Sequence, residues 1–453
     1  MEKSMINDLT KGSVLQQLIR FSLPFMLSNA LQTVYNLVDM VIVGQFVGST
    51  GLTAVSIGGQ LTWLLCCLAI GYSSGGQIYI SQLVGAGDHK SLNSTIGTLF
   101  TTLAALSILC TALGIGFHNV LLTLLNTPAE AFAQAKDYVI ICSAGMFFVY
   151  GYNIVSAVLR GMGDSKRPFL FIALAALLNV ILDLIFVGPL GLQAGGAALA
   201  TIVSQAVSFV VSIVYLYRRR ESFGFDFRPK SFAIDGKRLK ALSFLGLPLT
   251  VQNTAINVSM LYVSAGINNY GLTYASVYAI GGKLQSVMFI ITNSISTASA
   301  SMFGQNLGAG KYDRVKKVFW YGNLICVVFF ILVAALCLIF PAQIFRIFTE
   351  EADVISHAPY FMITLIVMFS GFALMTSGIA LINGIGNGSL SLVTALLDGV
   401  IVRIGLCILM AGPLGFGVWG YFWGNALAGY VSVIIGDFYY FTGRWKKRKL
   451  MIS

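Results

Sequence analysis

Long apolar runs alternate with short polar segments along the whole chain. Each run holds about 20 residues or more, the length that a helix needs to cross the hydrocarbon core of a bilayer. Hydrophobicity does not alternate from residue to residue within the runs, so they predict helices and not barrel strands. Twelve spans are predicted, at 17–43, 53–80, 92–117, 132–158, 168–187, 194–217, 241–266, 275–302, 317–340, 357–383, 391–411 and 416–441. The predicted fold class is an all-α polytopic membrane protein with 12 transmembrane helices.

Short motifs recur between the two halves of the chain at an offset of 223 or 224 residues. They are Leu23-Pro24 with Leu247-Pro248, Gly58-Gly59 with Gly281-Gly282, 82–87 (QLVGAG) with 305–310 (QNLGAG), 161–164 (GMGD) with 384–387 (GIGN), and 188–191 with 412–415 (both GPLG). The repeat predicts an N-lobe at 1–220, a cytoplasmic linker at 221–240 and a C-lobe at 241–453. Six crossings per lobe insert both lobes the same way up, related by a pseudo-twofold axis along the membrane normal, with a substrate cavity between them.

Basic residues gather on one side of the predicted membrane. Of the 28 Lys and Arg residues, 24 fall in segments on that side, Lys3 among them. The others are Lys136 and Arg346 on the opposite side and Lys283 and Arg403 inside spans. This bias predicts that both termini are cytoplasmic. It also accounts for the net charge of +11 without a nucleic-acid partner, because such loops face anionic lipid.

Composition excludes several classes of protein. Charged residues make up 10% of the chain and hydrophobic residues 57%, with a mean hydropathy of +0.83, whereas a soluble domain has about 25% charged residues. The seven cysteines lie in apolar runs without metal-ligand spacing and the three histidines do not cluster, so we expect no metal-dependent or histidine-based enzyme. The sequence shows no P-loop for ATP, and we expect no cleavable signal peptide at its polar start.

Two carboxylates, Asp39 and Asp183, lie inside predicted spans, where an ionised carboxylate costs about 2.5–3.5 kcal/mol on insertion scales. Each belongs to a polar stripe at helical spacing, and a third stripe follows the sixth span. The stripes are Gln32, Tyr35, Asn36 and Asp39; Asn179 and Asp183; and Thr201, Ser204, Gln205 and Ser208. Such stripes have two interpretations: a site facing the interior of the bundle, or contacts that hold helices together.

Depth favours one shared site for Asp39, Asn179, Asp183 and Thr201. Both carboxylates lie about five residues, or about 8 Å, before the outer ends of outward-running spans. Thr201 lies about seven residues, near 10 Å, past the start of an inward-running span. Two carboxylates, an amide and a hydroxyl are oxygen ligands suited to Na⁺ or a proton. We therefore expect a cation-coupling site in the outer half of the N-lobe, with no cofactor beyond this ion.

Other polar residues of the spans are candidates for the wall of a substrate cavity, with helix packing as the alternative. They are Gln32, Tyr35, Asn36, Tyr150, Asn153, Ser204, Gln205, Asn253, Asn257 and Lys283. Asp398 and Arg403 are five residues apart and face only loosely the same way on an α-helix. We therefore predict a weak intrahelical pair, with charge compensation in the C-lobe as the leading interpretation of Arg403 and Lys283. Lys283 can also snorkel to the interface.

The duplicated six-helix units, the Leu-Pro helix starts, the Gly-Ala-Gly loops and the Gly-x-Gly-Asp turn resemble the multidrug and toxic compound extrusion (MATE) family over essentially the whole chain. The resemblance implies a V-shaped cleft and export of drugs or metabolites in exchange for H⁺ or Na⁺. It also implies site roles: Asp39 is similar to the aspartate of the family's helix one, Asn179 and Asp183 to its helix-five pair, and Thr201 to its helix-six hydroxyl. This N-lobe site is similar to that of DinF-like members, and the resemblance implies a bacterial plasma (inner) membrane location.

The seventh predicted span carries Asn253 and Asn257 but no acid, so we expect no cation site in the C-lobe. We expect a monomer that works by alternating access, with small-molecule drugs or metabolites and membrane lipid as its partners. In this mechanism an outside H⁺ or Na⁺ neutralises Asp39 and Asp183, and the first helix bends at Pro24. A bound amphiphilic, often cationic compound then leaves outward.

Three alternatives come from other classes of membrane protein. A lipid-linked oligosaccharide flippase of a related superfamily predicts a wide basic central cavity, whereas the basic residues here gather in loops. A polytopic membrane enzyme needs a His, Glu or Ser/Cys constellation at the membrane surface, and none is visible in the sequence. A major-facilitator carrier also has two six-helix halves, but its basic Gly-rich loop after the second helix is replaced here by VGAGDHKS.

Overall fold

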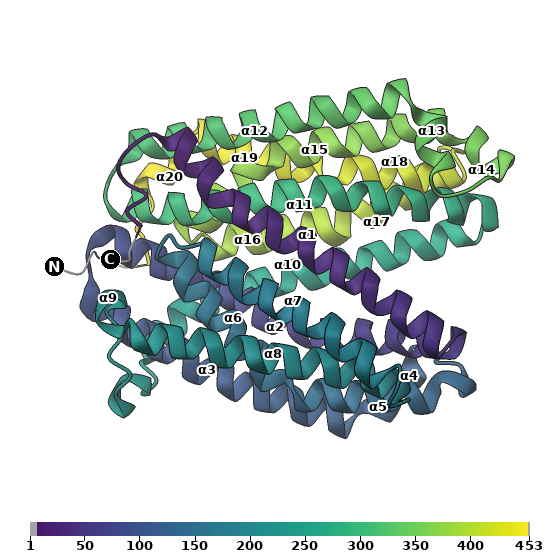
Figure 1. Cartoon of the computed structure of the whole chain (residues 1–453). Helices are drawn as coiled ribbons and strands as arrows, with labels where there is room; N and C mark the ends of the chain where they lie inside the picture. Colours follow the sequence, from purple (N-terminus) through teal and green to yellow (C-terminus); the bar gives the residue numbers. More distant parts are fainter. Residues whose placement is uncertain (1–6, 452–453) are drawn as a thin grey trace. The chain divides into compact units, whose positions relative to one another are not determined.

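The computed structural model describes residues 7–451, and Lys3 lies outside them. Within this range every regular element is a helix and no strand occurs (Figure 1). The all-α class predicted from the sequence is confirmed. The chain forms two compact units. Unit 1 contains Leu23–Thr250 and the described residues before Leu9, whereas unit 2 contains Leu9–Ser22 and the chain from Val251 onward.

Two long helices, α1 (Val14–Phe46) and α10 (Gly236–Asn268), each pass from one unit into the other. The other helices of unit 1 are α2 (Ser49–Ala86), α3 (His89–Gly116), α4 (His118–Leu124), α5 (Ala129–Ala144), α6 (Met146–Gly161), α7 (Lys166–Phe186), α8 (Gln193–Arg218), α9 (Arg220–Phe223) and the 3₁₀ helix η1 (Pro229–Phe232). Those of unit 2 are α11 (Leu272–Gly308), α12 (Tyr312–Ile339), α13 (Pro341–Arg346), α14 (Ala352–Ser356), α15 (Ala358–Ile385), α16 (Gly388–Leu396), the π-helix η2 (Leu397–Val402), α17 (Arg403–Ala411), α18 (Val418–Ala428), α19 (Tyr430–Phe441) and α20 (Arg444–Lys447).

The helices match the twelve predicted spans. Nine spans of the described chain are long and apolar enough to cross a membrane, and α5 with α6 makes a tenth. The remaining two are α1 and α10, which are 33 residues long but carry several amide and charged side chains. These polar groups lower the hydropathy of α1 and α10 without shortening them.

Three predicted spans are interrupted. The span at 132–158 consists of α5 and α6, which meet at Gly145 with a bend of 48°. A Cβ atom at Gly145 would collide with the Ile202 side chain of α8, so the glycine allows α8 to approach the break closely. The last span breaks at Gly429, between α18 and α19. The eleventh consists of α16 and α17 joined by the π-helix η2.

The segments that precede α1 and α10 are both anchored by side chains of neighbouring helices. In unit 2, Gln305 Oε1 accepts a hydrogen bond from the Leu9 amide at 3.0 Å, and the Arg314 guanidinium donates to the Leu9 carbonyl at 3.1 Å. In unit 1, Thr101 Oγ1 donates to the Phe232 carbonyl at 2.6 Å. Gln305 opens the repeated QNLGAG motif, so in unit 2 this motif helps to bind the chain where α1 begins.

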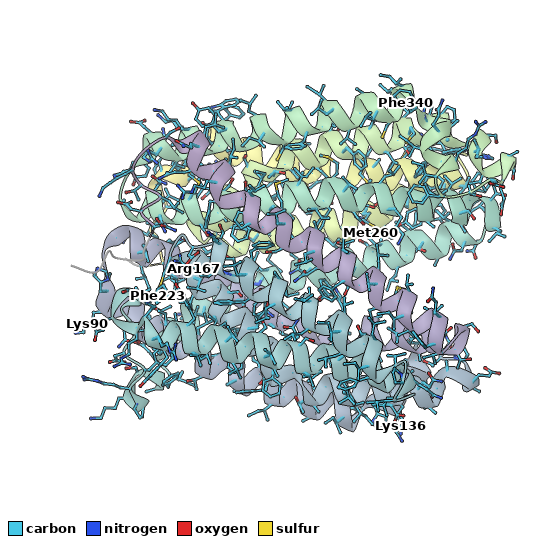
Figure 2. The ribbon with its side chains drawn as sticks, viewed as in Figure 1. Lys90, Lys136, Arg167, Phe223, Met260 and Phe340 are labelled. Carbon is cyan, nitrogen blue, oxygen red and sulfur yellow. The ribbon has the colours of Figure 1, made fainter. Side chains whose placement is uncertain are left out.

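Lysine positions agree with the predicted charge bias inside unit 1. Figure 2 shows Lys90 and Lys136 at opposite ends of the unit 1 helices. Lys90, at the start of α3, was expected on the cytoplasmic side, and Lys136 of α5 on the other. The two lysines thus lie at opposite ends of unit 1, and the assignment of these ends to the two sides of the membrane stays a prediction.

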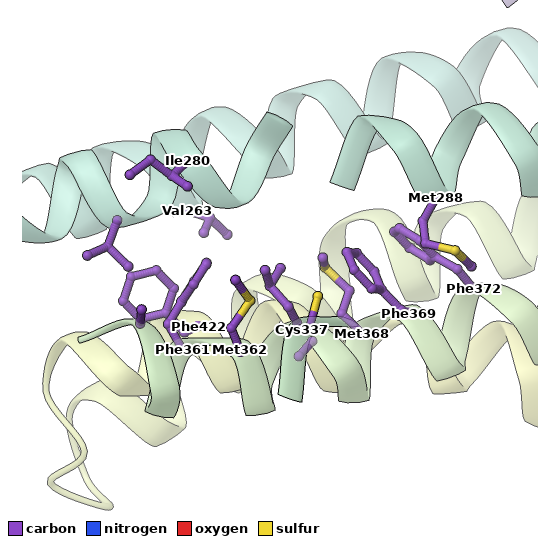
Figure 3. Packing of buried hydrophobic residues seen from close by; sticks show 14 of the residues in the cluster. Val263, Ile280, Met288, Cys337, Phe361, Met362, Met368, Phe369, Phe372 and Phe422 are labelled. Atoms are coloured by element: carbon purple, nitrogen blue, oxygen red, sulfur yellow. The ribbon is translucent and has the colours of Figure 1, made fainter. Parts of the chain in front are cut away.

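Unit 2 packs around aromatic and sulfur-containing side chains (Figure 3). Phe361, Met368 and Phe369 of α15 lie in this core, with Met288 of α11 and Phe422 of α18. These large side chains fill the space between the helices along the first half of α15. The core makes α15 the helix around which the others of unit 2 are arranged.

Glycines set the contact between α15 and α19. A Cβ atom at Gly378 would lie 2.8 Å from the Cα atom of Gly436, where only backbone is available to move. We expect Gly378→Ala to lower the free energy of unfolding by about 1–3 kcal/mol, because the helices must separate. Gly405→Ala in α17, with open space around it, is the control and should cost nothing. Thermal unfolding in detergent measures both, and equal transition temperatures would contradict the close contact.

Candidate functional site

Three helices of unit 1 bring the predicted cation residues together. α1 carries Asp39, α7 carries Asn179 and Asp183 one turn apart, and α8 carries Thr201. The carboxyl groups of Asp39 and Asp183 lie within hydrogen-bonding reach of each other. Asn179 Nδ2 donates a weak hydrogen bond of 3.5 Å to Thr201 Oγ1. These four residues form one cluster, which we call the acidic site.

Four carboxyl and amide oxygens of the acidic site are buried without a hydrogen-bond donor among the described residues. Asp183 has an exposed fraction of 0%. Both of its carboxyl oxygens, together with Asp39 Oδ1 and Asn179 Oδ1, are buried and receive no hydrogen bond from the described residues. Two adjacent carboxylates repel each other when both are ionised, and burial away from water strengthens that repulsion. The acidic site is therefore short of positive charge, which a proton or a small cation can supply.

Two tyrosines border the acidic site. Tyr35 lies one turn before Asp39 on α1, and Tyr138 of α5 is close enough to both to interact electrostatically. Gly58 of α2 makes room for Tyr138, because a Cβ atom there would come within 2.6 Å of the ring. The sequence did not predict that Tyr138 borders this site, because it lies on an apolar helix face. The repeated Gly58-Gly59 motif was the available signal, since glycine in a helix can mark a close approach.

The polar stripe on α8 serves two purposes. Ser204 Oγ donates to a backbone carbonyl one turn earlier at 2.6 Å, and Ser208 Oγ donates across to the Phe171 carbonyl of α7 at 3.0 Å. These two hydroxyls satisfy the backbone and hold α7 against α8. Gln205 Oε1, in contrast, is buried without a partner among the described residues, so it remains available to a ligand.

The other cavity candidates of unit 1 differ in how they are bound. Tyr150 is fully buried, and its hydroxyl donates to the Leu65 carbonyl at 2.8 Å. Asn153 Nδ2 donates to the carbonyl one turn earlier on α6 at 2.8 Å. On α1, Gln32 is half-buried and Asn36 is exposed, on the same helical face as Asp39. Asn36 is therefore the most exposed of these side chains, and Tyr150 is the least exposed.

The remaining candidates belong to unit 2. Asn257 Nδ2 donates to the Asn253 carbonyl one turn earlier on α10 at 2.7 Å. Lys283 is exposed on α11. An exposed lysine near the end of an apolar helix can extend its ammonium group towards the interface. These three residues belong to unit 2, whereas the acidic site belongs to unit 1.

The predicted weakness of the Asp398–Arg403 pair is wrong. Arg403 Nη2 and Asp398 Oδ1 form a buried salt bridge of 2.8 Å. The reason is η2, because a π-helix closes i→i+5 hydrogen bonds and places residues five apart on one face. Arg403 Nη1 also donates to Asn425 Oδ1 at 2.6 Å, and Ser432 Oγ donates to Asp398 Oδ2 at 2.6 Å. Charge compensation within the C-lobe is thus confirmed for Arg403.

The two halves of the chain can be compared residue by residue at the repeat offset of 224. In this comparison the surroundings of Arg403 in unit 2 correspond to the acidic site of unit 1. The equivalent of Asn179 is Arg403, and the equivalent of Thr201 is Asn425, so the Asn179–Thr201 hydrogen bond recurs as Arg403–Asn425. Asp39 and Asp183 correspond to Val263 and Cys407, which are not acidic. Unit 2 therefore has an arginine guanidinium at the position where unit 1 has the amide of Asn179 beside two carboxyl groups.

The fold and the acidic site together define a class: duplicated, all-helical membrane proteins with a sequestered carboxylate pair. A sequence model of the MatE family matches residues 24–185 and 248–409, which covers both halves at the offset of 224 residues. A relative in Bacillus subtilis (strain 168), "Probable multidrug resistance protein YpnP", is 30% identical over 98% of both chains. The chain belongs to the MatE family.

Further comparisons agree with this assignment. "Probable multidrug resistance protein YoeA" of the same organism is 30% identical over 76% of this chain and 75% of that protein. A solved structure described as the outward-facing conformation of a multidrug resistance MATE family transporter covers 99% of this chain and 100% of its own, with a TM-score of 0.90 at 23% identity. At that identity the likeness concerns the fold. It supports the twelve-helix architecture.

Proposed function

We propose that this protein is a secondary active efflux antiporter that exports amphiphilic, often cationic drugs or metabolites in exchange for H⁺ or Na⁺. The observation that carries the proposal is the carboxylate pair of unit 1, in which both oxygens of Asp183 and Oδ1 of Asp39 are buried and receive no hydrogen bond from the described residues. Such a pair in a membrane helix bundle is costly to maintain and is typical of an ion pathway. The relatives named as multidrug resistance proteins support the class of substrate.

In this proposal Asp39, Asn179, Asp183 and Thr201 hold the coupling ion. Na⁺ would be bound by carboxylate, amide and hydroxyl oxygens, and H⁺ would be shared between the carboxyls. The equivalent position in unit 2 differs, because Arg403 there forms a salt bridge with the buried carboxylate of Asp398. The coupling ion is the only cofactor required, and the protein performs no chemistry on its substrate.

The long helix α1 can connect the acidic site to the movement of the two units. Pro24 lies inside α1, two residues after the point where this helix leaves unit 2 and enters unit 1. Proline removes one helical hydrogen bond, so this is the position at which α1 bends most easily. Asp39 lies 15 residues further along α1, about 22 Å away. When Asp39 is neutralised, this part of α1 can pack in a less polar environment. A bend of α1 at Pro24 would allow that change in packing.

Substrate release follows from the same charges. Gln32, Tyr35 and Asn36 share a helical face with Asp39 and would contact a substrate beside it. A cationic substrate is held more tightly when the carboxylates are ionised, so binding of H⁺ or Na⁺ weakens it. By thermodynamic reciprocity, bound substrate lowers the affinity for the coupling ion by the same factor. This mutual exclusion makes the exchange obligatory.

We also propose that the protein belongs to the DinF-like branch of the family. We propose further that it is located in the bacterial inner membrane with both termini cytoplasmic, and that it is a monomer.

The test is uptake of a fluorescent lipophilic cation into proteoliposomes under imposed pH or Na⁺ gradients. We expect one gradient to drive uptake by the wild type, and Asp39→Asn to reduce the driven rate roughly 100-fold. Asp137→Asn, which removes an exposed carboxylate next to Tyr138, is the matched control and should behave as wild type. Equal driven uptake by wild type and Asp39→Asn would exclude Asp39 as a coupling residue. Absence of uptake with several cations would count against the substrate class.

A further inference from the structure

The outer surface of unit 1 contains an apolar groove between α3 and α8, with α6 as its floor. The groove has a volume of about 280 Å³ and is lined by Phe100, Thr101, Ala104, Phe147, Tyr150, Gly151, Ile154, Phe209 and Phe232. Its two polar side chains are already committed, since the hydroxyls of Thr101 and Tyr150 both donate to backbone carbonyls. The groove therefore offers only apolar surface to an occupant. We call it the α3–α8 groove.

The groove opens towards lipid on the half of the membrane next to the linker. Phe100 lies 11 residues after the start of α3, and Phe209 lies nine residues before the end of α8, so both are about 13–17 Å from the linker side. On the flanking helices, Ile108 has an exposed fraction of 67% and Val210 of 51%. Exposed apolar side chains of this kind are expected where helices face hydrocarbon.

The linker closes one end of the α3–α8 groove and is fixed there by aromatic contacts. Phe225 stacks on Phe100 with ring centroids 6.0 Å apart, and Phe232 packs edge-on against both rings. Ile234, two residues further on, has an exposed fraction of 52%. An exposed isoleucine in a basic segment, directly beside an apolar groove, is typical of a segment that lies in the membrane interface.

The linker that forms this end of the groove is rich in basic residues. The segment 218–240 contains eight basic and three acidic residues. Arg228 and Lys230, just before Phe232, are both exposed. The nearest acid, Asp226, accepts hydrogen bonds from Ser231 Oγ at 2.6 Å and from the Arg228 amide at 3.1 Å, which lower the pKa of its carboxyl group. The Arg228 guanidinium is 3.9 Å from that carboxylate and 81% exposed, so it remains available to another anion.

We propose that the α3–α8 groove binds one anionic phospholipid of the leaflet next to the linker. One acyl chain occupies the groove, and the phosphate headgroup is held by Arg228 and Lys230. The charge complementarity selects an anionic headgroup, because Lys and Arg near the membrane surface attract anionic lipids in preference to zwitterionic ones. The lipid would bind the linker and unit 1 together, independently of the acidic site.

The headgroup is tested by native mass spectrometry of the purified full chain titrated with phosphatidylglycerol or phosphatidylcholine. We expect one phosphatidylglycerol to bind more tightly than phosphatidylcholine. The variant Arg228→Gln with Lys230→Gln should weaken the binding of phosphatidylglycerol about 10- to 30-fold and leave the binding of phosphatidylcholine unchanged. Lys447→Gln with Lys449→Gln removes the same charge from exposed positions elsewhere and should change neither. Equal effects of the two double variants, or equal binding of the two lipids by wild type, would overturn the proposal.

The acyl chain is tested with a second pair of variants. Ala104 lines the groove, whereas Ala105, the next residue on α3, is exposed and does not line it. Ala104→Trp fills the groove and should abolish the tight phosphatidylglycerol site, while Ala105→Trp should retain it. Circular dichroism and thermal unfolding confirm that both variants are folded. Retention of the site in Ala104→Trp would show that the groove does not hold the lipid, because that side chain would occupy its space.

Discussion

Arg403→Met is expected to lower the free energy of unfolding by about 3–5 kcal/mol. The substitution leaves Asp398, which has an exposed fraction of 7%, without its counter-ion in the interior of unit 2. It also removes the donor to Asn425 Oδ1. A buried carboxylate without a partner must either remain charged at high cost or take up a proton, and both destabilise the folded state. Denaturant titration of the purified protein in mixed micelles measures the loss.

The repeat supplies the control for this variant. Unit 1 has Leu174 at the position equivalent to Asp398, and no ion pair forms there. The double variant Asp398→Leu with Arg403→Met should therefore recover most of the stability, because a buried ion pair can be replaced by apolar groups at little net cost. A single variant as stable as wild type, or a double variant less stable than the single one, would show that the pair does not carry this energy.

The positions of the spans were predictable because they follow from local hydropathy. A run of twenty apolar residues in a bilayer forms a helix, because a helix satisfies its backbone hydrogen bonds within the segment. The interruptions at Gly145 and Gly429 were not predictable in the same way, because they depend on what packs beside the chain. At Gly145 that neighbour is Ile202, which lies on another helix. Likewise, a hydropathy plot gives no sign that Leu9 is bound by Gln305, almost 300 residues away.

The acidic site was predictable to the extent that it depends on helical periodicity and depth. Asp39, Asn179, Asp183 and Thr201 lie at similar depth on three helices, and the structure brings them together. Tyr138 was missed because an aromatic residue on an apolar face has no distinguishing pattern.

The salt bridge of Arg403 was misjudged because its strength depends on a change of helix type. On an α-helix, residues five apart diverge by well over a hundred degrees. The π-helical turn η2 brings them to one face, and nothing in the residues between Asp398 and Arg403 makes that turn obvious beforehand. The buried acid needed a counter-ion, and the backbone adopted the less common helix that provides one.

The counterpart relation between Asn179 and Arg403 leads to the second large expected effect. Asn179→Arg should place in unit 1 a guanidinium like that of unit 2, one helical turn from Asp183, whose carboxyl group interacts with that of Asp39. This group would permanently compensate one of the two negative charges of the ionised pair, which is the charge that a bound monovalent cation would otherwise compensate. We expect ion-driven transport to fall about 100-fold, while the protein remains folded because the acids are now paired.

A stability measurement separates this effect from simple damage to the site. If the wild type binds its coupling ion only when folded, a concentration of 100 times Kd stabilises it by about 2.7 kcal/mol. Asn179→Arg should lose this dependence on added Na⁺ or H⁺, with an unfolding temperature at or above that of the ion-free wild type. Asn179→Met, of similar size and without charge, keeps the carboxylate pair and should still respond to H⁺. If Asn179→Arg still gains stability from the added ion, the arginine side chain does not replace the coupling ion. The affinity of the acidic site for the ion would then depend on the arrangement of its oxygens more than on its net charge.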